Sequence, residues 1–102
     1  MPEEFFVQLY EQDGDEIRHN GMLFEGADMG GIPLVGDTVI CPLSTRDFGS
    51  RDPEKHQSFD VERRYFMLDI TKDRPSTVNL VVTRRDLSNA ERRFFEGGAS
   101  AA

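Results

Sequence analysis

The sequence is poor in the residues that several protein classes require. Cys41 is the only cysteine among 102 residues, so no disulfide can form within the chain. Small secreted domains are usually rich in disulfides, and a lone cysteine therefore favours a reducing, cytoplasmic compartment. The first ten residues carry Glu3 and Glu4 and no Lys or Arg, unlike a secretory signal peptide. The apolar runs are much shorter than the ~20 residues that span a bilayer, so we expect no contact with a membrane.

Residues for metal binding or catalysis are equally scarce. The two histidines, His19 and His56, have no cysteine or carboxylate at metal-ligand spacing around them. A structural zinc site needs four well-spaced ligands, so the sequence predicts no metal and no cofactor. The hydroxyl residues between 44 and 50 have no paired base nearby, and no Gly-x-Ser-x-Gly motif is present. We therefore predict no catalytic residue.

Acidic residues outnumber basic ones, 19 to 12, and the net charge is −7. The imbalance lies in the first third: residues 1–31 sum to −7, residues 32–60 to −2 and residues 61–102 to +2. Nucleic-acid binding usually needs a broad basic face, so this distribution argues against such a function. The acidity of residues 1–31 can be explained by solubility alone.

Alternating or β-branched residues predict strands at 4–10, 38–41, 59–68 and 77–83. Either Asp13-Gly14 or Asn20-Gly21 supplies a hairpin turn, and the periodicity does not distinguish them. Residues 26–31 have the composition of a loop. Residues 43–58 form a long polar stretch, which in a domain of this size is either mobile or functional.

Two local signals refine this outline. Apolar residues change phase at Arg63-Arg64, as a β-bulge produces by inserting one residue. Ser88 and Glu91 have the spacing of a capping box, which predicts a helix over 88–96 that stops near Gly97. The chain then reads as one domain, residues 1–97, followed by a disordered tail, residues 98–102. The expected fold is mainly β: a small bent antiparallel sheet or barrel of five to six strands with one short C-terminal helix.

Arginine pairs are the only candidate ligand-binding residues. If strands 59–68 and 77–83 align suitably, a small basic patch forms beside an aromatic ring and could hold a phosphate or an acidic partner. The residues are Arg63, Arg64, Tyr65, Arg84 and Arg85. Their alternative role is ordinary pairing with nearby surface carboxylates, each pair contributing little.

A turn motif, Pro33-Leu34-Val35-Gly36-Asp37-Thr38-Val39, precedes the strand at 38–41. With the strands at 61–65 and 78–82, it resembles small uncharacterised bacterial β proteins that carry a Pro-x-Val-Gly-Asp-x-Val turn, and more distantly SH3-like small barrels. The resemblance implies a fold and no activity. Physically, Gly36 permits a sharp bend, and Asp37 can accept backbone N–H bonds there.

Three functions of different classes follow as hypotheses. The first is a non-enzymatic protein-binding or adaptor module, which also covers self-association into a homo-oligomer. The second is weak binding of single-stranded nucleic acid or a phosphate ligand by the Arg/Tyr patch. The third and weakest is an enzyme that uses Asp37 or His56 in a cleft.

Overall fold

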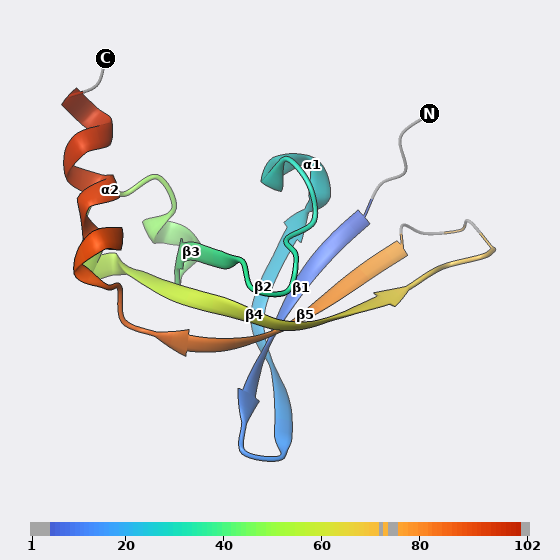
Figure 1. Ribbon diagram of the computed structural model, residues 1–102. Helices are drawn as coiled ribbons and strands as arrows, with labels where there is room; N and C mark the ends of the chain where they lie inside the picture. Colours follow the sequence, from blue (N-terminus) through green and yellow to red (C-terminus); the bar gives the residue numbers. More distant parts are fainter. Residues whose placement is uncertain (1–4, 72, 74–75, 101–102) are drawn as a thin grey trace.

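A computed structural model describes residues 5–71, 73 and 76–100 of the chain, and within these ranges the fold is mainly β (Figure 1). The strands are β1 (Phe5–Asp13), β2 (Glu16–Glu25), β3 (Thr38–Pro42), β4 (His56–Met67) and β5 (Ser76–Arg85). The helices are α1 (Gly26–Met29) and α2 (Asn89–Ser100), and 3₁₀ turns cover Thr45–Asp47 and Pro53–Lys55. The predicted fold class is confirmed.

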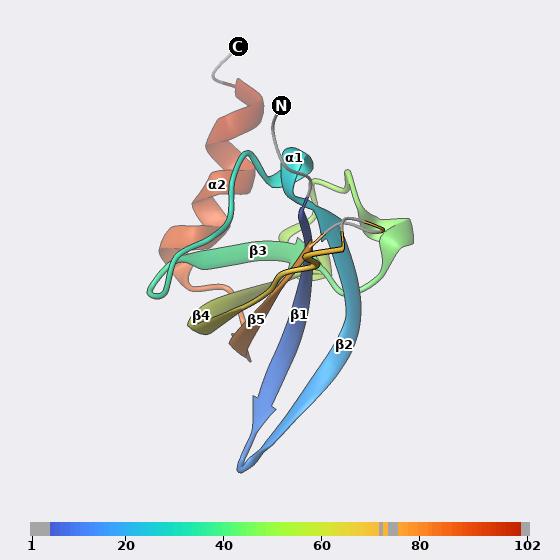
Figure 2. The same ribbon diagram turned by 90° about the vertical axis from the view of Figure 1, so that its right-hand side faces the viewer.

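The strands form one sheet in the order β2-β1-β5-β4-β3. Neighbouring strands are antiparallel except β1 and β5, which run parallel. The expectation of a wholly antiparallel sheet is wrong for this pair, because β2, β3 and β4 themselves make the crossover and no dedicated helix is needed. The sheet is strongly twisted and stays open, so the barrel alternative does not form (Figures 1 and 2).

The two turn signals in the first third have different roles. Asp13-Gly14 is the hairpin turn, since Asp13 pairs with Glu16 and Gly14 has a φ of 62°. Asn20-Gly21 lies within β2, where the register against β1 shifts between Gln8 and Tyr10. Extra residues in β2 there make a bulge, and Gly21 takes a φ of 86°.

The predicted bulge in β4 is confirmed. Val61 pairs with Val82 and Arg63 pairs with Val81, so one additional residue lies in β4 between these two pairs. The bulge exchanges the faces to which odd- and even-numbered residues point. Phe59 and Val61 are therefore core residues before it, whereas Arg63 and Tyr65 lie on the opposite face after it.

The core lies on one face of the sheet, which we call the inner face. Alternate residues of β1, β4 and β5 are fully or almost fully buried there, as the period of two in a strand requires. They are Val7, Leu9, Phe59, Val61, Val78, Leu80 and Val82. Met29 and Ile32, from α1 and the segment after it, pack against this cluster. Residues 26–29 were expected to be loop, and this expectation is wrong, because they form the short helix α1 that covers the inner face.

Helix α2 lies against the β3–β4 end of the sheet, and its start is fixed by the predicted capping box (Figure 1). Ser88 N donates to Glu91 Oε1 at 2.8 Å, and Glu91 N donates to Ser88 Oγ at 3.2 Å. The helix continues to Ser100, further than the expected end at residue 96. Residues 98–100 of the expected tail thus belong to α2, and residues 101–102 lie outside the described ranges.

The polar stretch 43–58 is partly ordered by its own side chains. Ser44 Oγ accepts from Arg46 N, and Asp52 Oδ1 accepts from Glu54 N, at the starts of the two 3₁₀ turns. Strand β4 begins at His56, so the stretch ends three residues earlier than expected. The turn expected at residues 73–76 includes positions 74 and 75, which lie outside the described residues.

Candidate functional site

The register of β4 against β5 separates the candidate arginines into two groups. Arg84 lies opposite Phe59, and Arg64 lies opposite Leu80. At ~3.3 Å per residue, the intervening length of β4 is about 16 Å. The alignment that would join Arg64 with Arg84 or Arg85 in one basic patch therefore does not occur.

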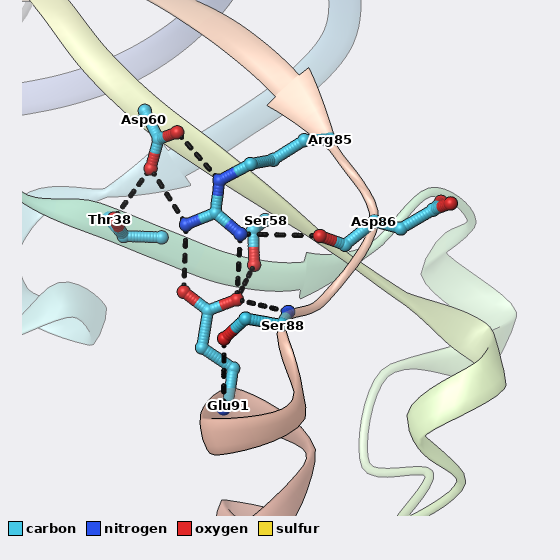
Figure 3. Close-up of polar contacts among 7 residues, drawn as sticks. All are labelled: Thr38, Ser58, Asp60, Arg85, Asp86, Ser88 and Glu91. Carbon is cyan, nitrogen blue, oxygen red and sulfur yellow. Dashed lines mark hydrogen bonds and ion pairs between the residues drawn. The ribbon is translucent and has the colours of Figure 1, made fainter.

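Arg85 belongs to a network that attaches helix α2 to the sheet (Figure 3). A guanidinium group has five N–H donors. In Arg85 all five are used, two toward Asp60, two toward Glu91 and one toward the Asp86 carbonyl. None remains for a phosphate or a nucleotide.

The same network shifts the pKa values of its members. Hydrogen bonds from Arg85, with smaller contributions from Ser88 and Ser58, hold the pKa of the Glu91 carboxyl far below its ordinary value. Hydrogen bonds from Arg85 and then Thr38 lower the pKa of Asp60. The two carboxylates in turn raise the pKa of Arg85. The network is therefore fully ionised at neutral pH, and its role is structural.

Arg84 is also engaged. Its Nε lies 3.2 Å from Glu11 Oε1, so the ion pair joins β5 to the neighbouring strand β1. The alternative role given to the arginines, pairing with surface carboxylates, therefore describes Arg84 and Arg85.

Arg63 and Arg64 are different, because each lies over an aromatic ring of its own strand. The Arg63 guanidinium is 5.3 Å from the centroid of Tyr65, and that of Arg64 is 5.1 Å from the centroid of Phe66. Neither forms an ion pair with any residue that the structure describes. Cation–π contact leaves the N–H groups at the rim of a guanidinium free to bind an acceptor.

This part of β4 has a free edge. Strand β3 ends its pairing at Thr38–Asp60, and the last contacts on that side join Val61 to the backbone of Gly36 and Asp37. From residue 63 to residue 67, β4 pairs with β5 on one side and, within the described ranges, with no strand on the other. Alternate backbone N–H and C=O groups of this segment therefore point away from the sheet.

Apolar side chains surround the free edge and are exposed on both faces. Tyr65, Phe66, Met67, Leu68 and Ile70 are all exposed, with Leu68 at 64% and Ile70 at 88%. On the inner face, Phe66 makes an edge contact with Phe5, and the ring centroids are 6.4 Å apart. We call residues 63–70 the β4 edge surface.

The turn motif proves to be a structural boundary of this surface. Gly36, with a φ of 97°, occupies the third position of a turn closed by Asp37 N donating to Leu34 O at 2.9 Å. Asp37 Oδ2 accepts from Leu34 N at 2.8 Å, which confirms the expected role of Asp37. The backbone of Gly36 and Asp37 also hydrogen-bonds to Val61, next to the bulge. These are the last backbone contacts that β4 makes on the side of β3.

Apart from a hollow of about 480 Å³ lined by residues of β1, β2 and β5, two hollows of the described residues contain Asp37 or His56. The larger, about 800 Å³, is lined by apolar side chains that include Phe24 and Phe48, whose rings stack 6.0 Å apart. Cys41 also lines it, and burial raises the pKa of this thiol to about 12. Asp37 lines this hollow and His56 lines the smaller one, so the two residues considered for an enzyme do not share a cleft.

The sequence contains a signal for the β4 edge surface in residues 65–68. Residues 65–68 are four consecutive apolar residues in a predicted strand, so apolar side chains must point to both faces. In a sheet with one covered face, such a run leaves part of its apolar surface in solvent. No comparable pattern in the sequence indicates the β4–β5 register, which separates Arg63 and Arg64 from Arg84 and Arg85.

Among residues 5–71, 73 and 76–100, no three His, Cys, Asp or Glu side chains are grouped to hold a metal ion. In the same ranges no helix has the length and apolar character needed to cross a membrane. No family model, curated protein or solved structure matches the chain. The resemblance to small β proteins with the Gly36-Asp37 turn stays a prediction.

Proposed function

We propose that this protein is a non-enzymatic binding module that takes an extended, acidic segment of a partner protein along the β4 edge surface. The observation that carries the proposal is the free edge of β4 at residues 63–67, bordered by exposed apolar side chains on both faces. The lone, buried Cys41 supports a reducing, cytoplasmic setting for this interaction.

Backbone hydrogen bonds supply the affinity in this mode of recognition. An extended peptide that adds a strand to a free edge satisfies the outward N–H and C=O groups of β4. Side chains of the peptide then alternate between the two faces. One set meets Phe66 and Leu68, and the other meets Tyr65 and Met67, so a peptide with apolar residues on both faces fits this edge.

The positive charge of Arg63 and Arg64 favours an acidic partner segment. Arg63 and Arg64 point to opposite faces and lack a described carboxylate partner, so acidic side chains in the peptide can pair with them. The net charge of −7 opposes an acidic ligand at long range. However, the acidic β1–β2 hairpin tip lies away from the β4–β5 hairpin (Figure 1). Beyond a Debye length of about 8 Å its charges are largely screened, and the local arginines dominate.

The experiment is selection of peptides from a phage-displayed random library on the immobilised protein, followed by affinity measurement with the enriched peptides. The test variant is Leu68→Lys. The matched control is Leu43→Lys, which changes another exposed leucine (48%) just beyond β3, outside the β4 edge surface. We expect enriched peptides to be acidic and apolar, to lose at least tenfold affinity with Leu68→Lys, and to keep it with Leu43→Lys.

Backbone amide shifts of residues 63–67 on peptide addition locate the binding edge. The proposal fails if no peptide is enriched, or if Leu68→Lys and Leu43→Lys bind equally. It also fails in its choice of partner if light scattering shows a dimer that Leu68→Lys converts to a monomer, because a second copy then occupies the edge.

Binding of single-stranded nucleic acid is the second candidate, favoured by the stacking of Arg63 on Tyr65. Without Arg84 and Arg85 this surface has two cations, which implies weak and strongly salt-dependent binding. An oligothymidine that displaces the selected peptide at low salt favours this candidate. An oligothymidine that leaves the peptide bound removes it.

A further inference from the structure

The smaller hollow lies between helix α2 and residues 49–56, apart from the β4 edge surface. Its volume is about 290 Å³. It has an apolar side formed by Ile40, Phe94 and Phe95, and a polar side formed by Ser50, Arg51 and His56. A hollow lined by apolar side chains and a few polar groups has the usual lining of a small-molecule site.

His56 is held in a fixed position on the polar side. It is only 8% exposed, and its Nδ1 lies 2.9 Å from the Asp52 carbonyl oxygen. Since a carbonyl oxygen only accepts hydrogen bonds, Nδ1 carries the proton of this contact. Nε2 is then the free nitrogen, and no described residue bonds to it. The Phe95 ring, 4.5 Å from the imidazole between centroids, fixes the orientation of His56 from the apolar side.

Arg51 provides the positive charge of the hollow. Its side chain makes no ion pair with any residue in the described part of the chain. By contrast, the neighbouring arginine of α2, Arg92, is paired with Glu54 across the same junction. Arg51 is therefore the cation at this hollow whose donors are available to a ligand.

The larger hollow lacks such groups. Its polar side chains are already bonded, because Asp37 accepts from Leu34 N and Thr38 donates to Asp60. The charged side chain that lines it, Asp37, is an anion and offers no cation to an acidic ligand. The smaller hollow is the better candidate for selective binding.

We propose that the hollow between α2 and residues 49–56 binds a small carboxylate with a flat or compact apolar body. The carboxylate pairs with the Arg51 guanidinium in a fork geometry. The apolar body lies against Ile40, Phe94 and Phe95. The bound molecule bridges α2 and the 49–56 segment, so it also fixes the helix against the sheet. This proposal is independent of peptide binding at β4.

Sodium benzoate is the probe, and benzamide, with the same ring and no charge, is the control ligand. Each is titrated into the isotope-labelled protein while the ring signals of His56 and Phe95 are followed by NMR. His19, on β2, is the internal reference histidine. We expect saturable shifts at His56 and Phe95 with benzoate, no shift at His19, and at least tenfold weaker binding of benzamide.

Arg51→Gln is the decisive variant, because Arg51 is exposed and has no described ion pair whose loss would unfold the chain. We expect it to weaken benzoate at least tenfold and to leave benzamide unchanged. The control Arg46→Gln, in the first 3₁₀ turn, should bind benzoate like the parent. The proposal is overturned if benzoate produces no saturable shift, if benzamide binds equally well, or if Arg51→Gln binds like Arg46→Gln. Leu68→Lys should keep benzoate binding, which separates this result from failure of the peptide proposal.

Discussion

Replacing Glu91 with glutamine tests whether the Arg85 network holds helix α2 to the sheet. Glu91 accepts two hydrogen bonds from Arg85, each at 2.8 Å, as well as bonds from Ser88 and Ser58. Glutamine has the same shape and retains the capping box with Ser88. The substitution therefore removes the charge of residue 91 and leaves the start of the helix in place.

The magnitude follows from the exposure of the pair. Hydrogen bonds to charged groups contribute about 1.5–3 kcal/mol, and fully exposed ion pairs about 0.2–1 kcal/mol. The Glu91 side chain is 15% exposed and that of Arg85 is 39% exposed, so solvent screens the pair in part. We expect the free energy of unfolding at pH 7 to fall by about 1.5 kcal/mol, measured by urea denaturation.

The effect has a defined pH dependence. The pKa of Glu91 is lower in the folded protein than its ordinary value of 4.5, chiefly because Arg85 donates to the carboxylate. As pH falls below about 5, the unfolded chain takes up this proton before the folded protein does, so the stabilisation declines. The difference between the parent and Glu91→Gln should be largest above pH 5 and should narrow steadily at lower pH.

Glu96→Gln is the matched control, an exposed glutamate on the same helix. It should change stability by less than about 0.5 kcal/mol, the usual range for a surface substitution. The reasoning is refuted if Glu91→Gln and Glu96→Gln are equally stable at pH 7. It is also refuted if the deficit of Glu91→Gln stays constant from pH 7 to pH 3.

Three further predictions concern single side chains. Asn79→Val should raise the free energy of unfolding by about 1 kcal/mol in urea denaturation, because Asn79 Oδ1 is buried without a described hydrogen-bond partner; a loss of stability would contradict this. Gly36→Ala should lower the melting temperature, costing about 1–2 kcal/mol, since Gly36 has a φ of 97° although its surroundings leave space for a Cβ; an unchanged melting temperature would show that the turn relaxes freely. At pH 8, Cys41 should react with a thiol reagent about a thousandfold more slowly in the folded protein than in the urea-unfolded protein. Burial raises the pKa of this thiol from 9.0 to about 12, so the reactive thiolate becomes correspondingly scarce. Comparable rates in both states would place the thiol in solvent.

Much of the fold was predictable because its signals are local. The β4 bulge and the capping box of α2 each depend on a few adjacent residues. The role of Asp37 in its turn is of the same kind. These features follow from the sequence without knowledge of the rest of the chain, whereas the choice of Asp13-Gly14 over Asn20-Gly21 as the hairpin turn needed the structure.

Strand order and register are not local, and there the sequence was insufficient. The parallel pairing of β1 with β5 depends on which strand can bury Val7 and Leu9 best, and several strands present similar apolar faces. The role of Arg85 depends on the register that brings Asp60 beside it and on the position of Glu91 on α2. Arg63, Arg64 and Tyr65 are consecutive in β4, and the expected grouping of Arg64 with Arg84 or Arg85 does not occur, because the register separates them.

The pairing of β1 with β5 also determines when the protein can fold. Phe5 pairs with Ser76, about seventy residues later in the chain, and β5 is the central strand between β1 and β4. During synthesis, the β1–β2 hairpin leaves the ribosome long before its partner exists, and the apolar faces of Val7 and Leu9 remain uncovered in the meantime. Contacts of such large sequence separation slow folding, because the chain must close a long loop first. The nascent chain is thus most prone to aggregation until β5 emerges and covers these side chains.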